Sequence, residues 1–524
     1  MNRTLQNPIL PGFYPDPSIC RAGEDYYLIT STFEYFPGLP IFHSRDLTNW
    51  HQIGHVLDRP SQLDLDGIRP SGGLFAPTIR YHQGVFYVIN TLVEGNQPYS
   101  TFIVTAENPA GPWSEPHWLK ESKGFDPSLF FDDDGRVWFT ENRPAFEGFY
   151  EGHSEIYLQE LDIETLQLIG EPFFLWDGAL KGGIWAESSH IYKKDGFYYL
   201  MSAEGGTAHH HSVMIARSES IVGPYYGNPG NPILTHRHLG LNFPIVGTGH
   251  ADLVETQNGE WWMALLAMRP YGGYFYNLGR ETFLAPVQWE DGWPVVCPGI
   301  GRVEMSFPAP DLPETIYPIL PKTDHFDNPQ LSFQWNFIRT PRETWYSLTE
   351  RPGFLRIKLR PQRLSKNENP SFVGRRQQHI HFSAKTVMEF TPKSQHETCG
   401  MALIQNPDFY FLFILTKQDD RIVLQLIRRA HGQESILTEK IVTDGQIFLK
   451  VEAHKQQYSF FYATSPDQWI PFVANADGRI LSTPVAGGFV GTYIGLYGSS
   501  NGEQSSNHAD FDWFEYSELA QQES

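Results

Sequence analysis

Cysteine, long apolar runs and positive charge are all scarce in this chain of 524 residues. The three cysteines, Cys20, Cys297 and Cys399, are far apart, which excludes a disulfide framework and a cysteine-based metal site. The longest apolar run, residues 409–415, is far shorter than the roughly 20 residues that span a bilayer. The N-terminal residues also lack an apolar stretch of signal-peptide length. We therefore expect a soluble cytoplasmic protein with no membrane partner.

The charge balance excludes further classes. Acidic residues outnumber basic ones by 60 to 39, and a net charge of −21 repels the phosphates of nucleic acid, so nucleic acid is not an expected partner. Charged residues make up only 19% of the chain and hydrophobic residues 40%, which excludes a disordered chain. No segment keeps a 3.6-residue apolar period, so a helical solenoid is excluded as well.

The chain is rich in aromatic residues, with 14 Trp, 25 Tyr and 37 Phe, and it contains an internal repeat. Five segments share a leading residue, a β-prone stretch, a turn with Gly or Asp, and an aromatic pair followed by an apolar run. The leading residues are Asp16, Ala76, Asp126, Glu187 and His250. They lie roughly 50 to 65 residues apart, which is room for four strands per repeat, and four-stranded units repeated radially form a β-propeller.

The repeat and the composition predict an all-β chain with two domains. We expect a five-bladed β-propeller over residues 1–306 and a proline-rich linker over residues 307–323. Residues 324–524 lose the repeat and show alternating strands, for example at 354–359, which predicts a β-sandwich of jelly-roll or concanavalin-like type packed on the propeller. Its aromatic residues supply either a carbohydrate-binding platform or the sandwich core, and the core is favoured.

The leading residues are candidates for chemistry because the first strand of each propeller blade lines the central channel. Each of them alone is typical of a turn or a side-chain cap, but four ionisable residues at one structural position indicate a site. Converging carboxylates raise one another's pKa. Glycoside hydrolysis needs one carboxylic acid to protonate the leaving oxygen and one carboxylate to activate water or attack the anomeric carbon. Phe75 and Phe125, which directly precede leading residues, are expected to pack on a sugar ring.

A cation is the weaker alternative for this position, since Asp16, Asp126, Glu187 and His250 are also able to ligate Ca²⁺ or another metal ion. We predict no metal ligand here and no required cofactor, although a structural Ca²⁺ is compatible with the sequence. The histidine run at residues 209–211 does not form one metal site, because consecutive residues of a strand point to alternating faces. We expect it to be a loop or rim element.

Several motifs surround the leading residues. They are residues 7–18 (NPILPGFYPDPS), 31–38 (STFEYFPG), 71–77 (SGGLFAP), 125–128 (FDPS), 247–252 (GTGHAD) and 278–282 (LGRET). In these motifs the sequence resembles the glycoside hydrolases of family 43, the β-xylosidases and α-L-arabinofuranosidases, over essentially its whole length. Two-domain members of that family join a five-bladed propeller to a C-terminal β-sandwich. There the sandwich contributes a loop that narrows the mouth of the active site.

The resemblance implies a role for each residue. Asp16 is expected to be the general base, Glu187 the general acid, and Asp126 a third carboxylate that orients Glu187 and tunes its pKa. Arg280 is expected to bind sugar hydroxyls and hold the acidic cluster. The pocket for the terminal sugar is expected to be lined by Phe33, Phe75, Phe125, Thr207 and His250. Two alternatives remain open: Arg280 as a purely structural ion pair, and His250 as a neutral residue that never touches substrate.

The expected activity is exo-acting, inverting hydrolysis that releases terminal β-1,4-linked D-xylose from xylo-oligosaccharides. The alternative is removal of α-L-arabinofuranosyl groups from arabino-oligosaccharides, alone or as a second activity, and a more distant one is a carbohydrate-binding propeller without catalysis. Phe75 stands where many family members have Trp, and Glu187-Ser188-Ser189-His190 where many have Glu-Gly-Pro-His, which leaves the sugar preference open. The oligomeric state is also open, and a homo-oligomer is compatible with the sequence.

Overall fold

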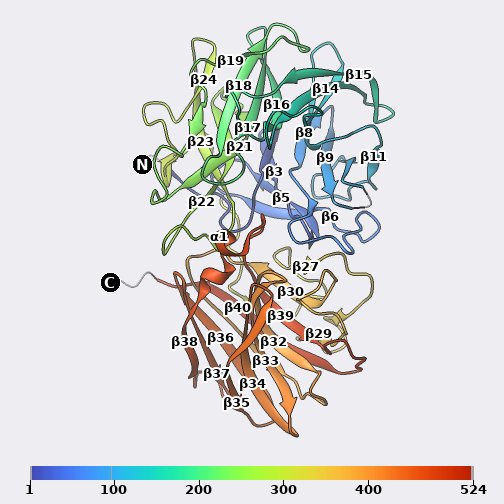
Figure 1. Cartoon of the computed structure of the whole chain (residues 1–524), viewed down its shortest axis with the longest axis vertical. Coiled ribbons are helices and arrows are strands. Elements are labelled where there is room, and N and C mark those ends of the chain that lie inside the picture. The colour runs from blue at the N-terminus through green and yellow to red at the C-terminus, as the bar shows by residue number, and fades with distance from the viewer. Residues whose placement is uncertain (1–2, 96, 521–524) are drawn as a thin grey trace.

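The computed structural model describes residues 3–95 and 97–520, and Figure 1 shows two β-rich bodies along the longest axis of the molecule. The upper body holds the N-terminal half of the chain and the lower body the C-terminal half. The described residues contain one α-helix of four residues, α1 (Thr483–Ala486), and one short 3-10 helix. No helix in this part of the chain is long and apolar enough to span a bilayer. The predicted all-β class is confirmed.

Five antiparallel sheets form the blades of the propeller. Blade I consists of β2 (Ser18–Ala22), β3 (Asp25–Ile29), β5 (Gly38–Ser44) and β6 (His51–Leu57). Blade II consists of β7 (Gly73–Leu74), β8 (Thr78–His82), β9 (Val85–Val93), β10 (Tyr99–Ala106) and β11 (His117–Leu119). Blade III consists of β12 (Phe125–Phe131), β13 (Val137–Pro144), β14 (Ser154–Asp162) and β15 (Gln167–Trp176). Blade IV consists of β16 (Glu187–Lys194), β17 (Phe197–Glu204), β18 (Ser212–Ser218), β19 (Tyr226–Gly227) and β20 (Leu234–Thr235). Blade V consists of β21 (Val246–Glu255), β22 (Trp261–Met268), β23 (Glu281–Glu290) and β24 (Trp293–Val296).

The ring of blades is closed by non-covalent contacts. The inner strands touch in the order β2, β8, β12, β16 and β21, and β21 contacts β2 again. The N-terminal segment adds to this closure, since β1 (Thr4–Gln6) pairs with β25 (Ser306–Pro308). The side chain of Asn7 also exchanges hydrogen bonds with the backbone of Leu284 in blade V. Phe307 and Pro308, expected at the start of the linker, therefore lie in a strand that pairs with the other end of the propeller.

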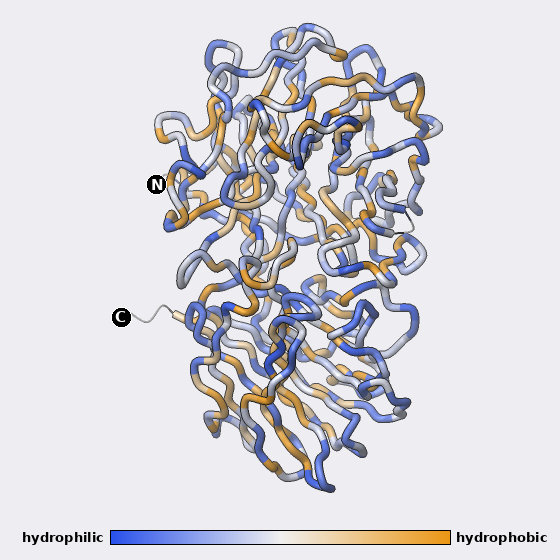
Figure 2. Tube along the Cα trace, in the orientation of Figure 1, coloured by the Kyte–Doolittle hydropathy of each residue, from blue (hydrophilic) through white to orange (hydrophobic). Residues whose placement is uncertain are grey.

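The C-terminal body is a sandwich of two antiparallel sheets. The first sheet contains β28 (Tyr346–Ser347), β29 (Leu355–Lys358), β40 (His508–Glu518), β31 (His381–Glu389), β36 (Gln446–His454), β37 (Gln457–Ala463) and β38 (Ile470–Asp477), with β26 (Thr323–Asp324) beside β40. The second contains β30 (Ser371–Arg376), β39 (Tyr493–Ser499), β32 (Thr398–Asn406), β33 (Phe409–Gln418), β34 (Arg421–Ala430) and β35 (Gln433–Ile441). In Figure 2 hydrophobic residues follow the strands of both bodies, and hydrophilic residues gather at loops and strand ends.

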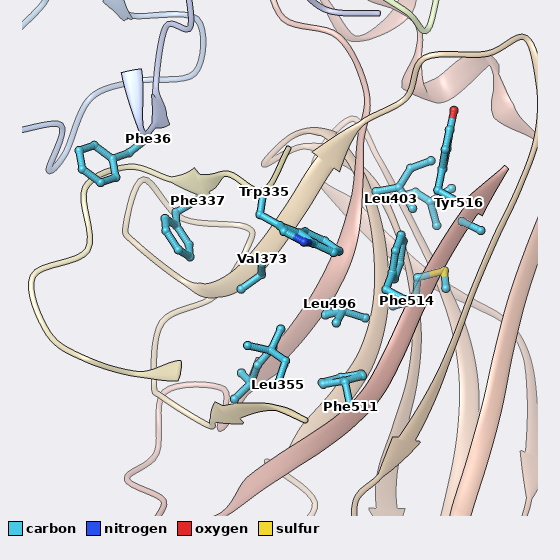
Figure 3. Close-up of a cluster of buried hydrophobic side chains, with 14 of the residues drawn as sticks. Phe36, Trp335, Phe337, Leu355, Val373, Leu403, Leu496, Phe511, Phe514 and Tyr516 are labelled. Atoms are coloured by element: carbon cyan, nitrogen blue, oxygen red, sulfur yellow. The ribbon is translucent and has the colours of Figure 1, made fainter. Parts of the chain in front are cut away.

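The two bodies share one hydrophobic core. A single cluster of buried side chains runs from blades I and II into the sandwich, and Figure 3 shows Phe36 of the propeller next to Phe337, with Trp335 farther into the sandwich. The backbone joins them as well, because β4 (Tyr35–Phe36) pairs with β27 (Phe337–Ile338). Burial of such rings stabilises by about 1.5–3 kcal/mol each, so this continuous core holds the sandwich in a defined place against the propeller.

Candidate active site

The leading residues of the repeat lie at or near the start of the inner strands in blades I to IV and inside β21 in blade V, and in four of the five blades the backbone there is bent. Asp16, Asp126 and His250 have φ values of 54°, 49° and 47°, and in blade IV the bend falls on Ser188, directly after Glu187, with a φ of 55°. In blades III, IV and V the strand register also shifts at this position. The left-handed region is rare for residues other than glycine but tolerated by Asp and His, and strain of this kind gathers at functional sites. The bend therefore gives the leading residues a different orientation from that of regularly paired strand residues.

A small pocket of about 70 Å³ lies at this point on the propeller axis. All nine residues predicted for the site line it, and two further residues, Ala76 and Phe489, complete the lining. The predicted residues are Asp16, Phe33, Phe75, Phe125, Asp126, Glu187, Thr207, His250 and Arg280. Ala76 is the one leading residue without a functional group, so it adds wall and no chemistry.

Asp16 is held as a carboxylate by the groups around it. Arg280 donates from Nη1 to Asp16 Oδ1 at 2.6 Å, and Ser31 donates from its hydroxyl to Oδ2 at 2.5 Å. His250 Nδ1 lies 3.6 Å from Oδ1. Burial alone would raise the pKa of Asp16, but Arg280, His250 and Ser31 together outweigh it and hold that pKa below its usual value. Asp16 is therefore ionised at neutral pH.

Asp126 and Glu187 have the opposite character. Burial raises the pKa of both carboxyl groups, and negative charge adds to the effect: Glu187 and Asp16 act on Asp126, and Asp16 acts on Glu187. Arg280 opposes the shift in each case without cancelling it. The pair therefore retains a proton at a pH where an exposed carboxyl group has lost it. One ionised and one protonated carboxyl group facing a single pocket is what general base and general acid catalysis requires.

Aromatic rings form the wall of the pocket. Phe33 packs against Phe75 and Phe489 with ring centroids 5.2 Å and 5.7 Å apart, and Phe75 meets Phe125 edge to face at 6.2 Å. The guanidinium of Arg280 lies over Phe33 and Phe489, 5.4 Å and 5.5 Å from their centroids. These rings exclude water around the carboxylates and offer apolar faces to the C–H side of a sugar.

A second polar layer lies among the same inner strands. Arg80 pairs with the fully buried Asp252 at 2.8 Å and also reaches His190 Nδ1 at 3.0 Å. Ser18 and Tyr192 donate their hydroxyl protons to the same Asp252 carboxylate at 2.7 Å. The network links blades I, II, IV and V through a buried ion pair and its hydrogen bonds. Removing one partner of such a pair strongly destabilises a protein. It therefore fixes the inner strands that carry the leading residues.

His211 and Phe489 were not among the predicted site residues. His211 is the last residue of the run expected to be a loop or rim element. It is buried, with Nδ1 hydrogen-bonded to Gly247 O at 3.1 Å, and it helps to lower the pKa of Asp16. A Cβ at Gly249 would lie 2.4 Å from the imidazole, so only glycine fits beneath this ring. The run lies in the loop between β17 and β18, as the expectation of a loop or rim element allowed, but His211 is buried beside the pocket and does not lie at the rim.

Phe489 comes from the sandwich, on a loop that docks over the propeller. Its backbone N–H donates to the Ser71 hydroxyl at 2.8 Å, and its carbonyl lies 3.5 Å from Arg280 Nη2. The loop approaches closely because two glycines meet: a Cβ on Gly279 would lie 2.9 Å from the Cα of Gly491. No motif of the repeat marks Phe489, since it belongs to the other domain. Only the expectation of a sandwich loop at the mouth of the pocket pointed to this region.

The fold and the pocket define the class of protein. A propeller whose axis carries three carboxyl groups in one pocket, an arginine and a wall of aromatic rings is built for hydrolysis of glycosides. The chain belongs to the glycosyl hydrolases of family 43, whose model matches residues 5–294, and a beta xylosidase C-terminal concanavalin A-like domain matches residues 323–517. The predicted propeller, sandwich and family are thus confirmed, and a propeller without catalysis is not retained.

Relatives match the chain from end to end. A xylosidase/arabinosidase of Butyrivibrio fibrisolvens is 46% identical over 520 residues, covering 98% of this chain and 99% of the relative. A non-reducing end alpha-L-arabinofuranosidase of Bacteroides ovatus is 41% identical over 98% of this chain and 95% of its own. Among solved structures, a xylan beta-1,4-xylosidase from Bacillus halodurans superposes with a TM-score of 0.93 at 39% identity, covering 98% of this chain and all of the other.

Proposed function

We propose that this protein is an exo-acting β-xylosidase that releases terminal D-xylose from β-1,4-linked xylo-oligosaccharides. The observation that carries the proposal is the small axial pocket in which Asp16, Glu187 and Arg280 lie beneath phenylalanine rings. Phe489 from the sandwich covers part of its mouth, so a chain end fits where the middle of a polymer does not. The relatives named as β-xylosidases support this substrate class.

The residues divide the reaction into two proton transfers. Glu187, protonated because burial and Asp16 raise its pKa, donates its proton to the glycosidic oxygen as the bond from that oxygen to C1 breaks. Asp16, ionised beside Arg280, takes a proton from a water molecule whose oxygen forms the new bond to C1. The pKa of Asp126 is raised as well, by its own burial and by the charges of Glu187 and Asp16, so Asp126 and Glu187 do not both ionise readily and a proton stays on the pair. Arg280 and His250 are placed to bind the sugar hydroxyls.

Single displacement with inversion is the stereochemical consequence we propose. Asp16 precedes β2 in blade I and Glu187 begins β16 in blade IV, so the base and the acid project from different blades across one axis. Inverting enzymes leave about 6.5–9.5 Å between the two carboxyl groups for the attacking water, whereas retaining enzymes bring them to about 5–5.5 Å. Placement on separate walls of the pocket favours the wider arrangement. No metal ion is needed in this scheme.

Release of α-L-arabinofuranose is the second candidate, because both the Butyrivibrio and the Bacteroides relatives carry arabinosidase or arabinofuranosidase in their names. The test compares kcat/KM on an aryl β-D-xyloside and on an aryl α-L-arabinofuranoside with the same leaving group. The proposal expects the xyloside to be preferred. A preference for the arabinofuranoside by about tenfold or more, equal to about 1.4 kcal/mol in the transition state, would reverse the assignment.

A further inference from the structure

A second cavity, of about 560 Å³, lies where the chain enters the sandwich. It is bordered by the end of the linker, by the segment after β30 and by the end of β40. It shares no lining residue with the catalytic pocket. The lining residues able to bind a charged group are Lys322, Gln334, Arg375, His379, Tyr516 and Glu518. Their charges are mostly positive, although the chain as a whole has a net charge of −21.

Arg375 is the unusual member of this lining. Only 9% of the residue is exposed, and its guanidinium carbon lies 4.4 Å from the centroid of the Tyr516 ring. Its Nη2 donates to Gln378 Oε1 at 3.0 Å, while its Nε is buried and has no hydrogen-bond partner among the residues that the structure describes. Figure 3 shows the hydroxyl of Tyr516 directed away from the apolar cluster.

The acidic groups near Arg375 are engaged elsewhere. Asp324 accepts hydrogen bonds from Trp335 Nε1 at 2.8 Å and from the backbone N–H of Phe326 at 2.9 Å. Glu518 points to His379 at 3.9 Å, and its side chain is 70% exposed. Within residues 3–95 and 97–520, Arg375 therefore makes no salt bridge. A buried guanidinium without a counter-charge costs several kcal/mol, which an anion in the cavity would offset.

We propose that this cavity binds a small anion that carries a carboxylate or a phosphate group. The fork of Arg375 holds the charged oxygens at the base of the cavity, where a bidentate, charge-assisted contact is strong. Lys322 adds a second positive charge from the exposed rim, and Gln334 supplies an amide. Gln378, whose side-chain oxygen accepts the hydrogen bond from Arg375, also donates from its amide nitrogen to the carbonyl of Pro11 in the propeller at 3.3 Å. Binding is therefore expected to stabilise the contact between the two domains.

Calorimetric titration of the full chain with inorganic phosphate, and separately with D-glucuronate, tests the proposal at constant ionic strength set by sodium chloride. We expect saturable binding of at least one of the two, with a matching rise in Tm. The anion that binds more tightly identifies the charged group. Absence of saturable binding for both anions up to about 50 mM would overturn the proposal. A Kd above that concentration corresponds to a binding free energy weaker than about −2 kcal/mol.

Variants locate the binding. Arg375→Gln should weaken it by about tenfold or more, and Lys322→Gln by a smaller factor, because each removes a charge-assisted contact. Arg421→Gln, at the exposed arginine that begins β34, is the matched control and should bind like the wild type. Lys322 is exposed, so its variant decides the question if Arg375→Gln does not fold. Unchanged affinity in Lys322→Gln and in a folded Arg375→Gln would assign the binding elsewhere, and kcat/KM on an aryl xyloside should stay unchanged in Lys322→Gln.

Discussion

Replacing Arg280 by methionine is expected to move the acidic limb of the pH profile of kcat/KM upward by about one to three pH units. Of the groups that lower the pKa of Asp16, Arg280 has the largest effect, and its Nη1 lies 2.6 Å from Asp16 Oδ1. Opposite charges about 4 Å apart at an effective dielectric constant of about 20 attract by about 4 kcal/mol, which is about three pKa units. Burial has the largest effect on the pKa of Asp16 and raises it. Without Arg280, this effect is opposed mainly by His250 and Ser31, so the pKa rises.

The sign follows from the role of Asp16. A general base works only when it is deprotonated, so activity falls as the pH drops through its pKa. In the wild type that pKa lies below the ordinary value of 3.8. The same low value stabilises the folded chain at pH values above the pKa in the unfolded state, and this stability is lost as the pH falls through the folded pKa. In Arg280→Met the pKa rises, so both the activity limb and the acid unfolding midpoint move to higher pH.

The assay is kcat/KM on an activated aryl β-D-xyloside from about pH 3 to pH 8, since this ratio reports the pKa values of the free enzyme. Arg269→Met is the matched control, because Arg269 forms a similarly close ion pair with the buried Glu281, at 2.7 Å, but does not line the pocket. It should lose stability without moving the limb. Arg280→Lys keeps the charge and should leave the limb near its wild-type position while kcat/KM falls. A limb that stays in place in folded Arg280→Met would refute this account of Asp16.

Three further outcomes are expected. Glu187→Ala should lose much less activity on an aryl glycoside with an activated phenol than on a xylo-oligosaccharide, because an activated phenol leaves without protonation. Asp16→Ala should lose about 10²-fold or more on both substrates. Equal losses on the two substrates for Glu187→Ala would contradict its role as the acid. Phe489→Ala should lower kcat/KM on xylobiose by about tenfold, because an aromatic wall contact is worth about 1–3 kcal/mol, while Phe333→Ala, half exposed outside the pocket, should have no effect. Dialysis against a chelator should leave kcat/KM unchanged, and loss of turnover that one specific ion restores would contradict the metal-free scheme.

The positions on the propeller axis were predictable because the repeat puts equivalent residues at equivalent places. Asp16, Asp126, Glu187 and His250 lead their repeats, and all four line one pocket. The pattern carries no information on the bent backbone at these positions, although Asp and His are the residue types that tolerate it.

Contacts between domains were not predictable in the same way. Phe489 reaches the pocket only because the sandwich packs against the propeller, a long-range event with no periodic signal in the sequence. The histidine run was expected to be a loop or rim element, and the burial of His211 was not predictable because it depends on the absent side chain of Gly249. Nor does the sequence show that Arg375 makes no salt bridge within the described residues, because this depends on the binding of the nearby Asp324 to Trp335.

The anomeric configuration of the first product tests the central claim most directly. If Asp16 activates water across the pocket from the acid Glu187, hydrolysis of a β-xyloside proceeds by one displacement and no glycosyl-enzyme intermediate forms. Proton NMR in the first minutes of the reaction, before mutarotation, should then show α-xylose as the initial product. An initial signal of β-xylose would contradict both the inverting mechanism and the role assigned to Asp16.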